Sequence, residues 1–221
     1  MKYYQKYLST CLLAIAALLG GASPAWAQVP LGTASNFAVL GGAGVTCTDS
    51  TIAGVVGSLL TVIPTPTCSI VGPTHQGDAT ANQAFNDFVL AYAALAAIPC
   101  PTDAPHLLSG DLVGKVLSPG VYCISGVGLL TGQLTLNGPS DGIWIFKAAT
   151  SLTPIGGSVV MAGGGQKRNV YWQTGTAVSL DNTDFVGNVL AGSAITFTGV
   201  GSSLVGRALA KTNVTLTGAN I

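Results

Sequence analysis

The spacing closest to a catalytic motif is G-x-S-x-G at residues 138–142. In hydrolases this spacing presents a nucleophilic serine at a strand–turn–helix junction, and the serine needs a histidine later in the chain. The sequence has two histidines, His75 and His106, and both precede Ser140. Pro139, next to a glycine, is typical of a turn. We therefore expect a turn between two strands here, and no serine hydrolase.

Three other groups of residues could do chemistry, and none forms a complete site. Neither histidine has a carboxylate or thiol at ligand spacing, so we expect both histidines in loops and no metal site. Asp181 and Asp184 could pair as in enzymes that cleave sugars, but such thinly spread acids fit solenoid corners, where they satisfy turn amides. Segment 163–168 (GGGQKR) lacks the GK[ST] ending of a phosphate-binding loop, so we expect a basic corner loop. We predict no enzyme and no cofactor.

The composition is poor in charge. Only 7% of the 221 residues are charged and none is glutamate, whereas ordinary soluble domains have about 25% charged residues. Residues 28–221 contain six basic residues and eight aspartates, without a basic run. Because nucleic-acid binding needs a basic patch, we exclude nucleic acid as a partner. The surface must be covered largely by uncharged polar and small residues.

The N-terminus has the pattern of a secretory signal peptide over residues 1–27. Lys2 and Lys6 form a basic start, residues 12–19 form a short apolar run, and small residues precede a cleavage position after Ala27. The apolar run is shorter than the roughly 20 residues that a membrane span needs. We expect a secreted protein without a membrane span.

Four cysteines remain after that cleavage: Cys47, Cys68, Cys100 and Cys123. An even number in an exported chain predicts two disulfides, with three possible pairings. We favour Cys47–Cys68 and Cys100–Cys123, which close the shortest loops. A zinc site would need close C-x-x-C spacing, which no pair has.

The C-terminal part of the chain repeats with a period of 19 residues. The units are 169–187, 188–206 and a shortened third, 207–221, and each contains an alternating core: Val178-Ser-Leu180, Ile195-Thr-Phe197 and Val214-Thr-Leu216. Alternation of period two predicts half-buried strands with the aliphatic residues inward. Turn residues follow each core, and a repeat of about 20 residues with short strands predicts a solenoid.

Hydroxyl side chains occupy the outward positions of these strands. We expect a ladder in which the first four residues are equivalent and the last two stand two positions further on: Thr135, Ser179, Thr196, Thr215, Thr198 and Thr217. Neighbouring strands lie about 4.7–4.8 Å apart, and same-face residues repeat at about 6.6–6.8 Å. Such a face would hold water in a regular, ice-like array. Threonine is also favoured in strands in general, so the ladder alone does not assign a ligand.

Residues 78–98 have a different pattern, which predicts one long helix. Their apolar residues form a single helical stripe: Ala81, Phe85, Phe88, Val89, Tyr92, Leu95 and Ala96. Asp78 or Thr80 can cap the start, and Pro99 ends it. The continuous apolar runs 143–146 and 170–172 predict strands buried on both faces under this helix. We expect one domain over residues 28–221.

Several segments together resemble a known family. They are Leu31-Gly-Thr-Ala-Ser-Asn-Phe-Ala-Val-Leu40, Pro119-Gly-Val-Tyr122, Asn169-Val-Tyr-Trp172, Asn188-Val-Leu-Ala191 and Gly206-Arg-Ala-Leu-Ala210 followed by Val214-Thr-Leu216. In this order the segments resemble the microbial ice-binding (antifreeze) proteins, and they cover nearly all of residues 28–221. We therefore expect a mostly β protein: an irregular right-handed β-solenoid (β-helix) with one long α-helix packed along its side.

The resemblance also implies a function. It implies a secreted, cofactor-free protein that adsorbs to ice, gives thermal hysteresis and inhibits ice recrystallisation, and we expect a monomer. It implies that the N- and C-terminal parts interleave in one solenoid, and that Cys100 and Cys123 flank the place of a capping segment found in some relatives.

The family does not mark its ice face by a strict motif. Residues 217–220 fit a loose T-[AG]-x-[TN] pattern of some members, and a second candidate face contains Val186, Ser202, Ser203 and Val205. The alternative function is a secreted adhesin or a carbohydrate-binding solenoid. That function favours exposed aromatic residues, whereas Trp144 and Trp172 lie in core-like strands.

Overall fold

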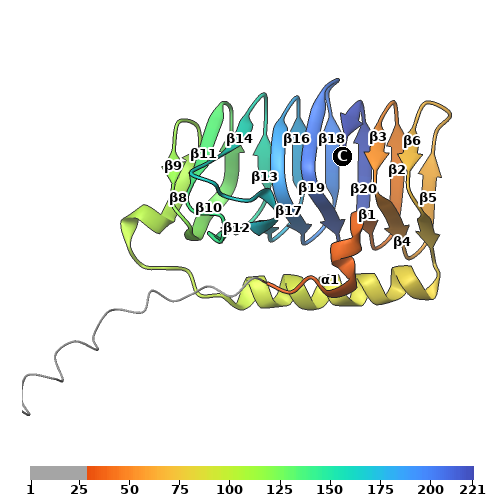
Figure 1. Cartoon of the computed structure of the whole chain (residues 1–221), viewed down its shortest axis with the longest axis horizontal. Coiled ribbons are helices and arrows are strands. Elements are labelled where there is room, and N and C mark those ends of the chain that lie inside the picture. Colours follow the sequence, from red (N-terminus) through yellow and green to blue (C-terminus); the bar gives the residue numbers. More distant parts are fainter. Residues whose placement is uncertain (1–28) are drawn as a thin grey trace, which may run out of the picture.

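The computed structural model describes residues 29–221, and these form a three-sided β-solenoid with one long helix along it (Figure 1). The predicted signal peptide, residues 1–27, lies outside the described residues. All strand pairs are parallel, and they fall into three ladders, which form the three faces of the solenoid. The expected mostly β solenoid is confirmed.

The first ladder lies under the helix, and we call it the helix face. In spatial order it contains β8 (Leu107–Asp111), the first half of β10 (Gly120–Leu130), β12 (Trp144–Ala148), β15 (Val170–Thr174), the second halves of β17 (Asp184–Ala191) and β19 (Ser202–Ala210), β1 (Phe37–Gly41), β4 (Val55–Ser58) and β7 (Thr74–Gln76).

The second ladder carries most of the predicted hydroxyl positions, and we call it the threonine face. It contains the end of β10, then β13 (Leu152–Pro154), β16 (Val178–Asp181), β18 (Ile195–Thr198), β20 (Asn213–Thr217), β2 (Gly44–Thr48) and β5 (Thr61–Pro64).

The third ladder is called the valine face, after its exposed valines. It contains β9 (Val116–Leu117), β11 (Gln133–Asn137), β14 (Ser158–Ala162), the first parts of β17 and β19, β21 (Ala219–Asn220), β3 (Thr51–Ala53) and β6 (Ser69–Val71). Three short 3-10 helices join these elements: η1 (Gly32–Asn36), η2 (Ala104–His106) and η3 (Lys167–Asn169).

The corner between the threonine and valine faces is made by residues with positive φ. In four adjacent coils the corner residue is Asn182 (φ 48°), Gly199 (φ 83°), Gly218 (φ 71°) or Asp49 (φ 48°). Glycine adopts this left-handed conformation without a steric penalty, and Asn and Asp tolerate it better than other residues. The turn residues that follow each repeated core therefore make this corner, as predicted.

The first and last strands of the described chain lie side by side in the middle of the solenoid. The chain winds β1 to β7 toward one end, returns along the solenoid in α1 (Ala79–Ala97) and the segment after it, and winds back from β8 to β21 (Figure 1). β1 therefore pairs with β19, and β2 pairs with β20. The implied interleaving of the N- and C-terminal parts is confirmed.

The helix α1 covers the helix face with one apolar stripe. Ala84, Phe88, Ala91, Tyr92 and Leu95 are buried against that face. The predicted stripe is correct in its centre but wrong at Ala96, which is exposed. The small residues Ala84 and Ala91 allow the helix to approach the strands closely, and the sequence pattern did not single them out.

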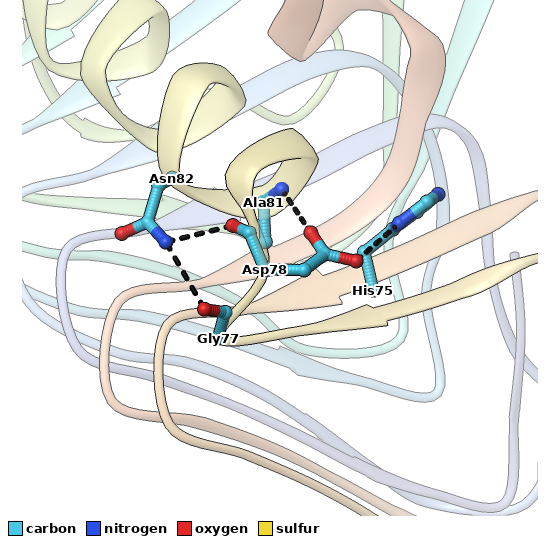
Figure 2. Close-up of polar contacts among 5 residues, drawn as sticks. All are labelled: His75, Gly77, Asp78, Ala81 and Asn82. Carbon is cyan, nitrogen blue, oxygen red and sulfur yellow. Dashed lines mark hydrogen bonds and ion pairs between the residues drawn. The ribbon is translucent and has the colours of Figure 1, made fainter.

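Asp78 caps the start of the helix (Figure 2). Its Oδ1 accepts a hydrogen bond from the Ala81 amide at 2.8 Å, and its Oδ2 lies 2.7 Å from Nδ1 of His75. The Asn82 side chain donates to the carbonyls of Gly77 and Asp78. The bonds that the carboxylate of Asp78 accepts from Ala81 and His75 lower its pKa, with the Ala81 amide as the largest cause. Of the two predicted caps, Asp78 is the one used.

The core consists of two layers. One lies inside the solenoid, where the rings of Tyr122, Phe146, Trp172 and Phe185 follow one another with centroids 5.4, 4.0 and 4.7 Å apart. The other lies between the helix and the solenoid and includes Tyr171. The runs predicted to be buried on both faces therefore divide their side chains between the two layers.

Both favoured disulfides are present. Cys47 is bonded to Cys68, and Cys100 is bonded to Cys123. The first connects β2 with the segment before β6, and the second connects the chain after α1 with β10. Within residues 29–221, no helix is both long and apolar enough to cross a membrane.

Candidate functional site

The threonine face carries two straight columns of outward side chains. In the first column, strand register places Ser179 beside Thr196, Thr196 beside Thr215, and Thr215 beside Thr46. Thr153 extends it, because the preceding Leu152 pairs with the residue before Ser179. Five adjacent strands thus present a hydroxyl at the same position.

The second column stands two residues further along the same strands. Asp181 pairs with Thr198, and Thr217 pairs with Thr48. Thr217 follows Leu216, which pairs with Phe197, so Thr198 and Thr217 are neighbours as well. With strands about 4.7–4.8 Å apart and residues about 6.6–6.8 Å apart along a strand, the two columns form a regular two-dimensional grid.

The inward residues of these strands hold the grid in place. Val178, Leu180, Ile195, Phe197, Val214 and Leu216 are all at most 1% exposed. A register slip of one residue would turn these side chains outward. The burial of the aliphatic residues therefore fixes the orientation of the hydroxyls.

The hydroxyls of this grid have no partner within the described part of the protein. No hydrogen bond joins the side chain of Thr46, Thr196, Thr198, Thr215 or Thr217 to another of residues 29–221, so these hydroxyls point to solvent. Some hydroxyls elsewhere are engaged: Thr33 donates to Asp87, Thr131 to Asp111 and Thr183 to the carbonyl of Asp181. The threonine face is thus a regular array of hydroxyls that are left free for water.

Of the predicted hydroxyl positions, Thr135 lies elsewhere. It is in β11 on the valine face, where it pairs with Val160 on one side and Val116 on the other. Its Oγ1 also accepts a hydrogen bond of 3.1 Å from Gln133. The expectation that Thr135 is equivalent to Ser179, Thr196 and Thr215 is therefore wrong, although its strand has the same inward–outward alternation.

The sequence analysis missed Thr46 and Thr48. They lie in β2, about 170 residues before the strand β20 that they pair with. A signal existed in the sequence, because Val45-Thr-Cys-Thr48 has the same pattern as Val214-Thr-Leu-Thr217. The two segments stack in register, and Thr46 and Thr48 continue both columns of the grid.

The electrostatics of the face are simple. Asp181 is the only charged side chain in the two columns described above. Near the β10 end, the carboxylate of Asp111 accepts hydrogen bonds from the hydroxyl and amide of Thr131, and the first of these is the largest cause of its lowered pKa. The grid itself therefore presents dipoles to water and almost no net charge.

The valine face is less regular than the threonine face. Val205 and Ser203 point outward as expected, but Val186 is only 5% exposed and Ser202 is fully buried. The inclusion of Val186 and Ser202 in a second exposed face is therefore wrong. Two polar side chains of the valine face also bond to each other, since the Ser203 hydroxyl donates to the Asp184 carboxylate at 2.6 Å.

The T-[AG]-x-[TN] segment 217–220 crosses a corner. Thr217 ends β20 on the threonine face, whereas Asn220 pairs with Thr51 on the valine face. The neighbouring coil turns the same corner between Thr48, which pairs with Thr217, and Thr51, which pairs with Asn220. The pattern therefore describes a turn between two faces and not a row on one of them.

The motifs that resembled catalytic ones serve as turns. Residues 138–142 lie between β11 and β12. The expectation that both histidines lie in loops is wrong for His75, which is in strand β7, whereas His106 ends the short 3-10 helix η2. Each contacts an aspartate three residues away, at 2.7 and 2.5 Å, so the expectation that no carboxylate stands at ligand spacing is also wrong. Within residues 29–221, no group of three or more His, Cys, Asp or Glu is arranged to hold a metal ion.

The aromatic residues are in the core. Trp144 and Trp172 are at most 1% exposed, and their indole nitrogens donate to the carbonyls of Leu117 and Val186. Within the described residues, no large exposed hydrophobic side chain is aromatic. The surface formed by residues 29–221 therefore has no aromatic platform of the kind on which sugars stack.

Comparisons with known proteins agree with this geometry. A profile of the family described as "Ice-binding-like" matches residues 27–221. An ice-binding protein of Nostoc sp. (strain HG1) is 38% identical over 189 residues, which cover 82% of this chain and 68% of that protein. An ice-binding protein of Flavobacterium frigoris (strain PS1) is 33% identical over 205 residues, which cover 85% of this chain and 74% of that protein.

Solved structures show the same fold. The crystal structure of an ice-binding protein from the Antarctic ascomycete Antarctomyces psychrotrophicus superimposes with a TM-score of 0.80 at 31% identity, covering 88% of this chain and 97% of that one. A glycosylated ice-binding protein from an Arctic yeast gives a TM-score of 0.77 at 28% identity, covering 88% and 94% of the two chains.

Proposed function

The chain belongs to the ice-binding-like family, and from this premise we propose that it binds ice through its threonine face. The sites would be the hydroxyls of two columns: Ser179, Thr196, Thr215 and Thr46 in the first, and Thr198, Thr217 and Thr48 in the second. The relatives' names support ice as the ligand, and the geometry supports this face.

The single observation that carries the choice of face is the grid of hydroxyls without protein partners. A threonine in a strand offers one hydroxyl, which holds a water molecule, and one methyl group, which does not. Repeated on a fixed lattice, these groups hold first-layer water in positions set by the protein. Charged groups would orient water around themselves instead, and the two columns contain only Asp181.

The strength of adsorption comes from many weak contacts made together. A single neutral hydrogen bond contributes only about 0.5–1.5 kcal/mol, but contacts held on one rigid body act at once. Rigidity matters, because ordering loose side chains on binding costs free energy. β-Branched threonine has few rotamers, and the packed inward residues, the helix and both disulfides restrain the strands beneath it.

Adsorbed molecules would divide a growing ice front into curved segments, and curvature lowers the local freezing point. Thermal hysteresis and inhibition of recrystallisation both follow from that effect. The activity involves no bond making or breaking, so the protein acts as a binding protein rather than an enzyme. We propose that it works as a secreted monomer after cleavage near Ala27. The two disulfides support secretion, because disulfides persist in oxidising compartments.

A secreted adhesin or carbohydrate-binding solenoid is the competing function. It has the same fold class but would use exposed aromatic side chains, and the described tryptophans are buried. We therefore place ice binding first.

The direct test is to watch single ice crystals in a solution of residues 28–221 under a cooled microscope. We expect faceted crystals that stop growing over a temperature gap. The control is the same protein after thermal unfolding and disulfide reduction, which should give smooth discs. Smooth discs with the folded protein would contradict ice binding and move the adhesin function to first place.

A further inference from the structure

Basic residues gather at one corner of the solenoid, although the sequence has no basic run. Lys167 and Arg168 lie in η3, between the valine face and the helix face, and Arg207 lies in β19 where that strand passes from one face to the other. They are brought together because β17 pairs with both β15 and β19. Half of the six basic residues in residues 28–221 therefore stand at one corner.

No carboxylate neutralises this corner within residues 29–221. The ion pairs of the described residues lie away from this corner and join His75 to Asp78 and His106 to Asp103. None of them involves a lysine or an arginine. The guanidinium of Arg207 is held by neutral acceptors, with Nε donating to the carbonyl of Ser35 at 2.7 Å and Nη1 to Oδ1 of Asn188 at 2.9 Å. Burial lowers the pKa of Arg207.

The corner is also hollow. A cavity of about 370 Å³ is lined by Arg168, Arg207, Tyr171 and Asn188 together with the N-terminal segment from Val29 to Ser35. On the other side of the two arginines, a second cavity of about 410 Å³ is lined by Lys167 and Val205 among others. The two arginines therefore form the wall between two concave spaces that are open to solvent.

We propose that this cationic corner is an oxyanion-binding site that recognises a carboxylate, sulfate or phosphate group. A guanidinium has five donors in a planar fork that matches such groups. Within the described residues, the bonds of Arg207 use Nε and Nη1, which leaves Nη2 for a ligand. Arg168 is exposed, and within residues 29–221 its guanidinium makes only one long contact, of 3.4 Å, to Gln166. An anion between the two arginines would be held by charge-assisted hydrogen bonds.

The position of the site has a consequence for how the protein is used. In a three-sided solenoid, the corner between the valine and helix faces lies across from the threonine face. A ligand at this corner leaves the threonine face uncovered. An acidic polymer bound here could therefore hold the protein at a surface while the opposite face stays free.

Binding is tested by NMR on the folded protein, following the Arg207 Nε–H signal and the backbone amides of Tyr171 and Asn188. Sodium sulfate is titrated against sodium chloride at matched ionic strength, and sodium polygalacturonate is titrated separately. We expect saturable shifts confined to the corner with sulfate. Saturation by the polymer at a lower concentration of charged groups would identify a polymer ligand, and equal concentrations would identify the free ion.

Variants separate a site from general charge. Arg168→Gln should weaken sulfate binding about tenfold, the effect of losing one charge-assisted hydrogen bond. Lys115→Gln removes the same charge near β9 and should leave binding unchanged. Arg207→Lys keeps the charge but loses the fork, and it should also weaken binding. The proposal is overturned if sulfate gives no saturable shift, or if Arg168→Gln and Lys115→Gln bind alike.

Discussion

The sharpest test of the threonine face is Thr215→Tyr. Thr215 is in β20, within the first column, with Thr196 on one side and Thr46 on the other. The phenol ring is longer than the threonine side chain by more than one ring diameter, so it would stand above its neighbours by more than the 2.7–2.8 Å length of a hydroxyl–water hydrogen bond. A rigid face cannot bend around such a step.

The expected loss follows from the contacts that the ring lifts off. These are the hydroxyl of Thr215 itself and those of Thr196, Thr46 and Thr217. At about 0.5–1.5 kcal/mol each, four contacts amount to about 2–6 kcal/mol, which is a factor of about 30 to 10⁴ in binding. We therefore expect thermal hysteresis to fall below detection and the fraction of protein incorporated into a growing ice hemisphere to drop accordingly.

Thr135→Tyr is the matched control. Thr135 is also a partly exposed, outward threonine in a strand, but it lies on the valine face. Substitutions at exposed positions usually change stability by at most about 0.5 kcal/mol, so both variants should melt within about 2 °C of the parent. Full activity in Thr215→Tyr would refute the assignment of the face. If Thr135→Tyr alone lost activity, the valine face would be the ice face.

Three further predictions concern glycosylation, one disulfide and the pH dependence of stability. Asn213 heads the sequon 213–215 and is exposed on β20, so protein from a eukaryotic secretory host should carry a glycan over the threonine face and lack ice shaping, and Asn213→Gln from that host should regain it. Replacing Cys47 and Cys68, 21 residues apart, by serine should cost about 3 kcal/mol in urea unfolding. The pKa of Asp78 is lower in the folded protein than the usual value of 3.8, so its ionised carboxylate stabilises the fold at pH values above 3.8. This contribution is lost as the pH falls through the folded-state pKa. Asp78→Asn should therefore show a shallower loss of melting temperature below pH 4.

The sequence predicted what depends on local pattern. Period-two alternation identified Ile195–Phe197 and Val214–Leu216 as strands and correctly divided their residues into inward and outward. The helix followed from its apolar stripe, and the cysteine spacing favoured the disulfides that are present. In each case the residues that form the pattern are close together in the sequence, within one strand, one helix or one loop closed by a disulfide.

The face to which a strand belongs was not predictable in the same way. Alternation separates inside from outside, but a three-sided solenoid has three outsides. Leu134-Thr-Leu136 has the same alternation as Val214-Thr-Leu216, yet the corners before it place Thr135 on the valine face. Assigning a face requires knowing where each coil turns, and this depends on glycine and asparagine conformations that local pattern does not fix.

Thr46 and Thr48 join the grid only when the N-terminal strands pair with the C-terminal strands. Thr46 and Thr215 are neighbours only because β2, near the start, pairs in register with β20, near the end. Forming that seam requires α1 and the segment after it to carry the chain to the far end of the solenoid, and it requires β1 to insert between β4 and β19. A one-residue slip at the seam would turn Thr46 and Thr48 inward and expose Val45 and Cys47. The Cys47–Cys68 disulfide lies on the N-terminal side of this seam, and the bond from Arg207 to Ser35 crosses it. They therefore protect the regularity of the threonine face without belonging to its surface, and the face is a property of the closed solenoid rather than of any single repeat.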